Sequence, residues 1–547
     1  MPVCLDQRQL PGVSRLFADY LYDFARVAAF YGQEGGQDGA ALAPISLAAA
    51  AARVDYPAER RARVAAALEA QNRGWGAGPA TLAHLDQLRR PGTVAVVSGQ
   101  QTGLFGGPLL TVYKAATAVL AAEHLRAQGQ AAVPVFWLAT QDHDLAEVNQ
   151  AWVVSADGQP VRLELPAPDA PPRSPVGRVL LGDGIAAALS AFAQATGATP
   201  EAMATLAAAY QPGASFANAF ARLLTMWFAP WGLILMDPMD QSLAAEAAPL
   251  LAEVLAREDA LAASLRRRGQ ELESAGYHLQ VNDAGAALLF LETEGQRQPL
   301  RRAAGGWRAG DRGFDTAELA DVLGAEPLRV SPGALLRPLV QDWLLPTAAQ
   351  VTGPAETAYL AQSAALYAVL GRSQPLRLPR LSATLVDARA RRLLEKYHLS
   401  VPDIWRLEPQ GNAAEALALH LARQVLPEDL TAELHAQRDA ASRGFAAFSA
   451  RLGEVDPTLV DFARTAGDKV RHQFEQVEDK LARSLARRQA DLARQARHLA
   501  GLVYPGRHLQ ERRWNSAAAA VRLGAAWPGL LHDQLRFGCR DHQILDI

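Results

Sequence analysis

Cysteine is nearly absent from this sequence. Cys4 and Cys539 are the only two in 547 residues, and they stand at opposite ends of the chain. Their number and spacing exclude a disulfide framework, a Cys-based zinc site and an iron–sulfur cluster. Because free cysteines are typical of a reducing compartment, we expect the protein to be cytoplasmic.

Long apolar runs and an excess of positive charge are also missing. No uninterrupted apolar stretch approaches the roughly 18 residues of a membrane-spanning helix, and the first ten residues do not have the pattern of a secretory signal. The 54 Lys and Arg residues are outnumbered by 57 Asp and Glu, which gives a net charge of −3. Proteins that bind nucleic acid usually carry a basic face, so we expect neither nucleic acid nor a membrane as a partner. The histidines show no metal-ligand spacing, and we expect no structural metal.

The composition that remains is that of a large globular protein. Half of the residues are hydrophobic and 20% are charged, which is enough apolar surface to build a sizeable core. At roughly 100–200 residues per domain, the chain should contain two to four structural units.

A βαβ unit is the first clear pattern along the chain. Residues 93–97 form a short β-branched run, residues 108–128 a helical pattern that opens with a proline, and residues 133–138 a second apolar run. A strand, a helix and a strand in this order predict a parallel sheet with helices on its faces. Residues 231–236 and 348–351 read as further strands of the same sheet.

The rest of the chain divides by composition. We expect hairpins and a Pro-rich loop over 152–181, helices over 185–228 and 241–273, a small β insertion over 286–307, and a helix within 330–351 that is capped by Ser331 and Pro332. The expected domains are an N-terminal helical segment (1–90) packed on the core, the core (91–240), an insertion (241–330), the return of the core (331–384), a helical coiled coil (385–505), and a C-terminal segment that returns to the core (506–547).

The coiled coil is predicted from apolar spacing. Apolar side chains step by three or four residues and then by seven, at Val470, Phe474, Val477, Leu481, Leu485, Leu492 and Leu499. This is an a/d-type stripe, with charged residues on the other faces. A second helical stretch at 430–452 ends before a Gly and an Asp-Pro break, which predicts an antiparallel hairpin. A projecting coiled coil is favoured over a helix packed on its own domain.

The Gly-rich loop between the first strand and its helix is the most informative segment. Glycines let the backbone approach a ligand, and free N–H groups at a helix start favour an anion. Its candidate binding residues are Ser98, Gly99, Gln100, Gln101, Thr102, Gly103, Phe105, Gly106, Gly107 and Thr111, with Lys114 to add a positive charge. The spacing fits neither the Walker loop nor the dinucleotide fingerprint, and an ordinary Gly-rich turn is the alternative.

A polar cluster, Gln141-Asp142-His143-Asp144, follows the next strand. It should face the same crevice, because the carboxyl ends of parallel strands lie on one edge of the sheet. His143 could orient or deprotonate an amine, with Asp142 or Asp144 fixing its tautomer. The alternative is that Asp144 caps the next helix, with Glu147 as the partner of a capping box.

A third group lies around the last predicted strand. Arg337 and Gln341 are four residues apart on one helix face, while Gly353, Glu356, Tyr359 and Gln362 open the helix after the strand. Arginine is the usual partner of carboxylate and phosphate groups. We expect Arg337, Gln341 and Glu356 to close the crevice, and Lys114 with its helix start to hold an anion.

These blocks resemble the cysteine ligase family of bacillithiol biosynthesis (BshC). The matching stretches are SGQQTGLFGGPLLTVYK (98–114), PVFWLATQDHDLAEVN (134–149) and SPGALLRPLVQDWLLPTAAQVTGPAETAYLAQ (331–362). Shorter matches lie at 379–384, where Arg380 is a further candidate binding residue, and at 509–515. The order and spacing of these stretches agree with those of the family over nearly the whole chain. Two departures are Gln141, where the family commonly has Glu, and Gly106, where it commonly has Thr.

The resemblance implies an α/β fold, with a Rossmann-like core similar to class I aminoacyl-tRNA synthetases, connecting-peptide insertions, and a coiled coil that pairs two subunits. It also implies the joining of cysteine to glucosaminyl-malate through an amide bond in the last step of bacillithiol synthesis. An adenine nucleotide, ATP or ADP, is expected to take part, with Mg²⁺ as its companion. The alternatives are a nucleotidyltransferase that acts on another amino acid or sugar, and a non-catalytic coiled-coil scaffold.

Overall fold

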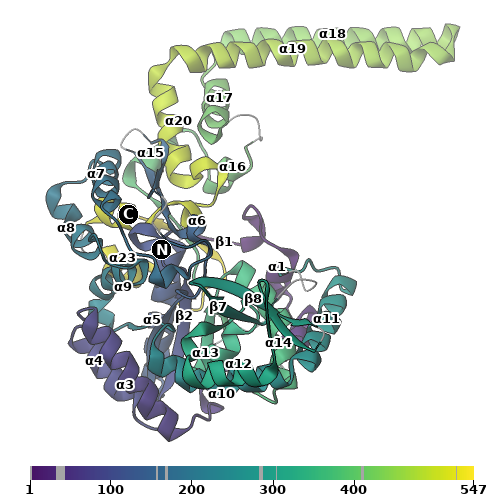
Figure 1. Cartoon of the computed structure of the whole chain (residues 1–547). Coiled ribbons are helices and arrows are strands. Elements are labelled where there is room, and N and C mark those ends of the chain that lie inside the picture. Colours follow the sequence, from purple (N-terminus) through teal and green to yellow (C-terminus); the bar gives the residue numbers. More distant parts are fainter. Residues whose placement is uncertain are drawn as a thin grey trace. The chain divides into compact units, whose positions relative to one another are not determined.

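The computed structural model describes residues 3–32, 44–155, 158–166, 170–281, 287–303, 305–407, 412–524 and 527–547. Its contacts divide the chain into two compact units. The first comprises residues 1–153, 161–384 and 511–545, and the second comprises residues 154–160, 385–510 and 546–547. The C-terminal segment from residue 511 to 545 thus belongs to the first unit (Figure 1).

A five-stranded parallel sheet forms the centre of the first unit. Its spatial order is β6-β3-β2-β12-β13, and all four strand pairs are parallel. The strands are β2 (Val94–Gln100), β3 (Ala132–Leu138), β6 (Ile234–Met236), β12 (Thr347–Thr352) and β13 (Leu376–Pro379). Numbered by their place in the chain, they run 3-2-1-4-5, which is a doubly wound arrangement. This confirms the predicted parallel sheet and the Rossmann-like core that the resemblance implies. The fifth strand, β13, is not among the predicted ones.

Both faces of the sheet are covered, which is why its strands read as nearly continuous apolar runs. Val94 and Val96 of β2 share a core with the helices α2 (Pro44–Ala52) and α5 (Leu110–Ala127). Ala95 and Val97 point the other way, into a core with other helices of the unit. These helices are α3 (Ala58–Gly74), α4 (Pro79–Leu88), α10 (Gln241–Ala256), α13 (Arg337–Leu344) and α14 (Pro354–Val369).

The topology fixes where a ligand can bind. From β2 the chain winds outward through β3 and β6, and it later returns to β12 on the other side of β2. The strand order therefore reverses between β2 and β12. In open α/β sheets, ligands occupy the crevice outside the carboxyl ends of the strands at such a point. Here those ends are Gln100 and Thr352.

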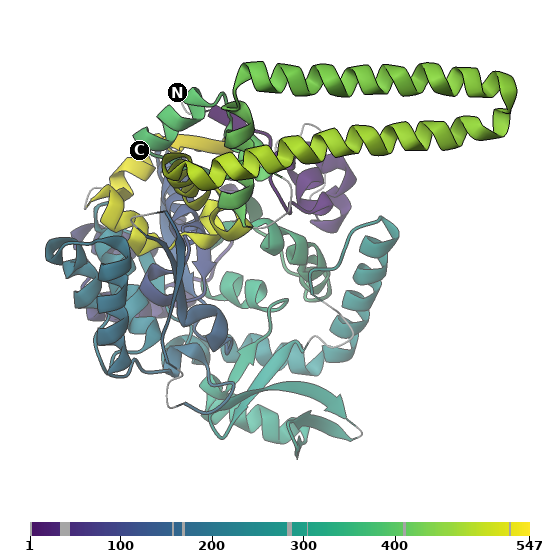
Figure 2. The same ribbon diagram turned by 90° about the horizontal axis from the view of Figure 1, so that it is seen from above.

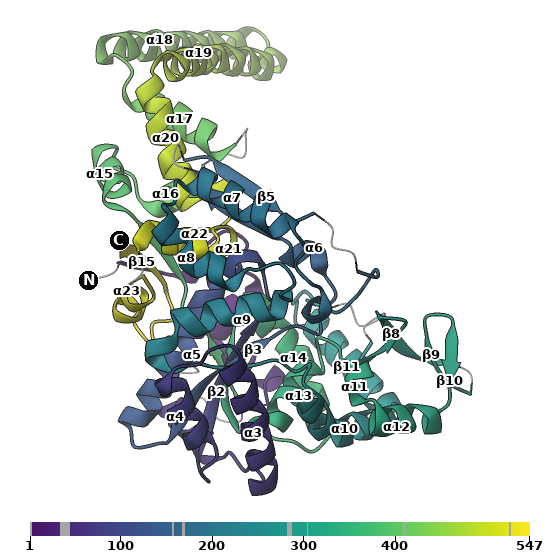
Figure 3. The same ribbon diagram turned by 60° about the vertical axis from the view of Figure 1, so that its left-hand side comes forward.

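Several insertions interrupt the chain between the strands of the central sheet, and Figure 3 shows them around those strands. A hairpin of β4 (Gln150–Val154) and β5 (Pro160–Glu164) precedes the helices α7 (Gly184–Thr196), α8 (Pro200–Ala209) and α9 (Phe216–Trp227). After α10 and α11 (Glu258–Ser274) comes a second sheet, in the order β10-β9-β8-β7-β11. Its strands are β7 (Leu289–Thr293), β8 (Gln296–Ala303), β9 (Gly306–Ala309), β10 (Arg312–Phe314) and β11 (Val330–Pro332), and α12 (Thr316–Ala325) precedes β11. These elements confirm the predicted hairpin, helices and β insertion.

The prediction that Ser331 and Pro332 cap a helix is wrong. Both lie in β11, which pairs antiparallel with β7, and α13 begins only at Arg337. A Ser-Pro pair is a common helix start, but pairing with a strand some 40 residues earlier in the chain overrides that local preference.

The chain termini meet in a small three-stranded sheet that the sequence analysis does not predict. Its order is β1 (Val3–Leu5), β15 (His542–Asp546), β14 (Ala383–Val386). The other α-helices of the first unit are α1 (Arg15–Tyr22), α6 (Leu145–Val148), α22 (Ser516–Leu523) and α23 (Trp527–Gln534), with most of α21 (Gln510–Arg513).

The second unit contains a long helical hairpin. The helices α18 (Glu428–Val455) and α19 (Val460–Arg488) pack against each other and run in opposite directions (Figure 2). They are accompanied by α15 (Ala388–Lys396), α16 (Val401–Trp405), α17 (Ala413–Gln424) and α20 (Ala490–Val503). This confirms the predicted antiparallel hairpin.

One detail of the coiled-coil prediction is wrong. The helical pattern is broken at Gln489, whose ψ of 89° is not helical, so Leu492 and Leu499 belong to α20. Both are buried, and α20 packs on α17. The seven-residue spacing therefore continues through two helices with different neighbours. None of the described helices combines the length and apolar character needed to cross a bilayer.

Candidate active site

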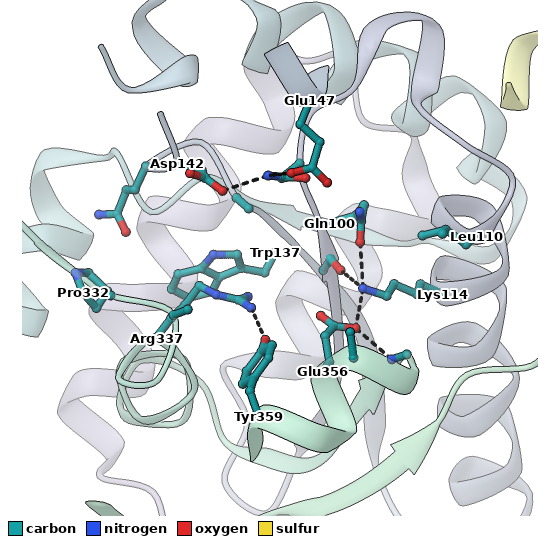
Figure 4. Close-up of a pocket in the computed structure, with 18 of the residues that line it drawn as sticks. Gln100, Leu110, Lys114, Trp137, Asp142, Glu147, Pro332, Arg337, Glu356 and Tyr359 are labelled. Carbon is teal, nitrogen blue, oxygen red and sulfur yellow. Dashed lines mark hydrogen bonds and ion pairs between the residues drawn. The ribbon is translucent and has the colours of Figure 1, made fainter. Parts of the chain in front are cut away.

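A cavity of about 590 Å³ lies at the carboxyl ends of the central strands (Figure 4). Four parts of the first unit line it: the loop after β2 with the start of α5, the segment after β3, the second sheet with the start of α13, and the start of α14. Arg380 and Arg512 complete the lining. This is the crevice predicted from the strand order, and it is lined by both apolar and charged side chains.

A buried ion pair spans the point where the strand order reverses. The ammonium of Lys114 in α5 lies 2.6 Å from Oε2 of Glu356 in α14. Lys114 Nζ also donates to the carbonyl of Gly99 and to Oε1 of Gln100, each at 2.8 Å. An ammonium has three donors, so all of them are engaged within the protein. Lys114 thus binds the loop to α14 and keeps no donor for a ligand unless one of these contacts opens.

The electrostatics of this pair favour the charged form of Glu356. Burial alone would raise the pKa of Glu356, but the charges of Lys114 and Arg337 outweigh it and lower the pKa below its usual value. Burial lowers the pKa of Lys114, against the effect of Glu356. Glu356 Oε2 also accepts from the backbone N–H of Gly353 at 2.8 Å and so caps α14.

One wall of the cavity is acidic. The side-chain amide of Gln101 donates to Asp142 Oδ2 and to Glu147 Oε2, each at 2.8 Å, and so holds the two carboxylates close together. Burial raises the pKa of Glu147, and the neighbouring aspartates add to the rise. Asp144 and Glu147 are both exposed to solvent, and Asp144 caps α6 through the N–H of Glu147 at 3.2 Å. Because Glu147 bonds to Gln101, Asp144 acts as the predicted cap without a reciprocal capping box.

His143 has a different partner from the expected one. Arg297 of β8 donates from Nη1 to Nδ1 of His143 at 3.1 Å, while Asp142 Oδ1 is 3.8 Å from that nitrogen. The prediction that an aspartate fixes the tautomer of His143 is therefore wrong. Burial and the charges of Arg173 and Arg297 lower the pKa of His143, so the ring is neutral at neutral pH. Because Nδ1 accepts a hydrogen bond, the neutral ring carries its proton on Nε2.

A second part of the lining, the cationic wall, is formed by guanidinium groups. Arg297 is fixed by hydrogen bonds to Ser331 Oγ at 2.9 Å and to the carbonyl of Pro332 at 2.7 Å, and burial lowers its pKa to about 10. Arg337 at the start of α13 donates to the hydroxyl of Tyr359 at 2.6 Å. Among the described residues, no hydrogen bond or ion pair engages the side chain of Arg512. Three guanidinium groups thus face the cavity from three different elements.

Behind this wall lies a fully buried network. Arg380 Nη1 donates to Glu511 Oε2 at 2.9 Å, and a second contact makes the pair bidentate. Ser382 donates to the same carboxylate at 2.8 Å and lies 2.7 Å from Nδ1 of His542. Burial works against ionisation of Glu511, but Arg380 outweighs it and lowers the pKa of Glu511 to about 2. The network ties the C-terminal segment to the edge of the cavity.

Many of the predicted site residues are brought together. Those that line the main cavity are Gly99, Gln100, Gln101, Lys114, Asp142, Arg337, Gly353, Glu356, Tyr359 and Arg380, together with Gln141. Gly103 and Gly107 line a neighbouring pocket of about 190 Å³, which shares Gln100 and Gln101 with the first.

Other predicted residues lie outside the lining of both pockets, namely Ser98, Thr102, Phe105, Gly106, Thr111, His143, Asp144, Gln341 and Gln362. Phe105, at a φ of 55°, packs against Phe192 and Tyr210. Gln341 is buried and bonds to Asp342, so it does not close the crevice as predicted. The side-chain amide of Gln362 accepts from the backbone N–H of Val281 at 3.2 Å and donates to its carbonyl at 2.8 Å.

Three charged residues of the lining are absent from the predicted site: Arg297, Arg512 and Glu147. The sequence predicts Glu147 only as a capping partner. Arg512 lies in the 509–515 stretch that carries the resemblance, which was a usable signal. Arg297 comes from the β insertion, and nothing in its local sequence distinguishes it from the arginines around it. In the part of the chain that the structure describes, no group of three or more His, Cys, Asp or Glu side chains is placed to hold a metal ion.

Comparisons with known proteins match nearly the whole chain to one family. Residues 3–381 match the model of the N-terminal Rossmann-like domain of BshC from bacillithiol biosynthesis, and residues 383–547 match its C-terminal coiled-coil domain. The chain belongs to the BshC family. Its Rossmann-like and coiled-coil domains are those that the resemblance implies.

Curated relatives cover the full length. A "Putative cysteine ligase BshC" of Solibacter usitatus (strain Ellin6076) is 37% identical over 99% of both chains. A relative with the same name from Koribacter versatilis (strain Ellin345) is 37% identical over 100% of both chains. A third, from Salinibacter ruber, is 34% identical over 97% of this chain and 96% of its own.

Proposed function

We propose that this chain is a ligase that joins the carboxyl group of cysteine to the amine of glucosaminyl-malate, forming the amide bond of the last step of bacillithiol synthesis. The observation that carries this proposal is the match to the BshC family along nearly the whole chain. The relatives are named for cysteine ligation, and the lining of the cavity contains groups suited to both substrates.

The acidic wall supports recognition of the amine. Asp142 and Glu147 lie on either side of the Gln101 amide and would attract an ammonium group. Amide formation requires the free amine, so a proton must leave the ammonium. The raised pKa of Glu147 makes it a better proton acceptor than a carboxylate with an ordinary pKa. We therefore assign amine binding to Asp142 and proton acceptance to Glu147, while His143 positions Arg297.

The cationic wall supports recognition of carboxylates. Arg297, Arg337 and Arg512 present guanidinium groups, which bind carboxylate or phosphate in bidentate fashion. The malate part of the acceptor carries such carboxylates. Arg337 is held by Tyr359 through one nitrogen only, which leaves its other donors to a ligand.

We also propose that ATP takes part, with Mg²⁺ as its companion. Forming an amide from a free carboxylate in water is unfavourable, and the nucleotide supplies the activation of that carboxylate. The residues present fit a phosphate group, because the guanidinium groups of Arg297, Arg337 and Arg512 line the cavity. Arg337 and Arg512 would hold the phosphates.

The test is direct synthesis. The purified protein is incubated with ATP, cysteine and glucosaminyl-malate, and the thiol product is followed by mass spectrometry. We expect product only when all three substrates are present. Transfer of a nucleotidyl group to another amino acid or sugar would favour the nucleotidyltransferase, and nucleotide binding without any product would favour the scaffold.

Assembly and location complete the proposal. We propose that the hairpin of α18 and α19 pairs two subunits and that the enzyme works in the cytoplasm. The hairpin carries exposed apolar side chains, namely Leu430, Phe448, Val455, Phe462 and Val477. A second copy of the same hairpin would cover them.

A further inference from the structure

The two cysteines of the chain meet in space. Cys4 and Cys539 are 535 positions apart in sequence, yet their sulfur atoms are 3.5 Å apart. Neither cysteine forms a disulfide in the structure, and both are partly exposed to solvent. The sequence separation that excluded a disulfide framework says nothing about this contact, because the two chain ends return to the same small sheet.

The backbone holds the two thiols in place. Cys4 lies in β1, whose antiparallel register places it opposite Gln543 of β15, and Cys539 lies in the turn that leads into β15. Gln7 donates to the carbonyl of Arg540 at 2.6 Å, and the hydroxyl of Tyr22 donates to Asp541 at 2.8 Å. The segment that carries Cys4 is thus bound to the residues that directly follow Cys539.

We propose that Cys4 and Cys539 form a reversible redox pair that exchanges with low-molecular-weight disulfides. The sulfurs need to approach by only about 1.5 Å to reach bonding distance. This inference does not depend on the proposed ligase activity, since it rests on the termini and not on the cavity.

The exchange is balanced in two steps. The thiolate of one cysteine attacks the small disulfide, which gives a mixed disulfide and releases one small thiol. The second cysteine, as a thiolate, then attacks the protein sulfur of the mixed disulfide and releases the second small thiol. The protein loses two electrons and two protons, and the small disulfide is reduced to two thiols. Burial raises the pKa of Cys539 to about 11, so the exchange is expected to be slow at neutral pH.

Oxidation should stabilise the protein. The new bond would close a loop over almost the entire chain, from position 4 to position 539. Closing a long loop restricts the unfolded chain more than closing a short one. We expect the melting temperature of the oxidised protein to lie several degrees above that of the reduced protein.

The test uses the full-length protein and glutathione disulfide as the probe. After incubation, we expect the two free thiols to disappear, the intact mass to fall by two hydrogen atoms, and a peptide map to show Cys4 joined to Cys539 within one chain. Dithiothreitol should restore both thiols and the lower melting temperature.

The variants Cys4→Ser and Cys539→Ser separate this pair from two independent thiols. Each lacks its second sulfur, so the remaining cysteine should stop at the mixed disulfide and the mass should rise by one glutathione. Stable mixed disulfides in the wild type, disulfides between chains, or unreacted thiols would each overturn the proposal. The decisive measurement is made on the wild type, so it does not depend on how well the variants fold.

Discussion

Lys114 and Glu356 form a buried ion pair, 2.6 Å apart, that joins the helix after β2 to the helix after β12. The two helices follow the strands between which the order of the sheet reverses. The pair therefore fixes the distance between the two sides of the candidate active site. Its role is structural as well as electrostatic, because Lys114 uses its donors inside the protein.

Removing one member of this pair should destabilise the protein. Lys114→Met leaves the carboxylate of Glu356 buried without its partner, which typically costs about 3–5 kcal/mol. We expect a lower urea midpoint for the transition of the first unit. The double variant Lys114→Met/Glu356→Gln should recover much of the loss, because no unpaired charge remains. A single variant as stable as the wild type would contradict the role of the pair.

The sequence predicts much of the central fold for a physical reason. The strands of the sheet are short apolar runs that end in polar or glycine residues, and the helices between them show clear start signals. The break at Gln489 could not be predicted, since neither Gly nor Pro marks it. Strand β1 was missed because three residues carry too little pattern.

The candidate site was predictable where it follows strand ends and unpredictable where it depends on pairing. The loop after β2 and Asp142 lie in the cavity as expected. The contact of Arg297 with His143 joins an insertion to the core, and no local pattern reveals it. For the same reason the pairing of Lys114 with Glu356 was missed, and Lys114 was expected to be free for a ligand.

Asp142 and Asp144 provide a matched test of the acidic wall. Asp142 lines the cavity, whereas Asp144 is exposed and caps α6. Asp142→Asn should lower the rate of product formation by about tenfold or more, because a hydrogen bond to a charged group contributes about 1.5–3 kcal/mol. Asp144→Asn should retain most of the activity, because asparagine is as good an N-cap as aspartate. The rates are compared by steady-state product formation, and equal losses in both variants would contradict this assignment.

Two variants of His143 distinguish a base from a positioning residue. The side-chain oxygen of asparagine can accept the hydrogen bond of Arg297 much as Nδ1 does. If His143 positions Arg297, His143→Asn should keep the rate within a few-fold of wild type, and His143→Ala should lose about tenfold or more. If His143 is the general base, both should lose about 10²–10⁴-fold, and the pH–rate profile should lose its acidic limb.

The buried His542 predicts a pH dependence of stability. Burial lowers its pKa from 6.5 to about 4, so between these values the unfolded chain binds a proton that the folded chain does not. The contribution of His542 to the free energy of unfolding should therefore fall by on the order of 3 kcal/mol as the pH falls from about 6.5 to about 4. His542→Gln should flatten this part of the curve, measured as melting temperature against pH. An unchanged slope would show that His542 does not titrate in this way.

The hairpin of α18 and α19 predicts how the subunits pair. Phe462 and Val477 of α19 are 74% and 51% exposed, although both are apolar. If a second hairpin covers them, Phe462→Glu/Val477→Glu removes about 1.5–3 kcal/mol per side chain from the interface and adds charge repulsion. The dimer dissociation constant should rise by at least about 10²-fold.

Light scattering over a range of concentrations measures this change. The control is Arg464→Gln/Arg471→Gln, which alters two exposed arginines of the same helix without touching its apolar side chains. Because all four side chains are largely exposed in the single chain, both variants should keep the helical content of the wild type. The control should remain dimeric while the glutamate variant becomes monomeric. A glutamate variant that stays dimeric would show that the subunits meet at another surface. A wild type that is monomeric at every concentration would show that the hairpin does not pair two subunits.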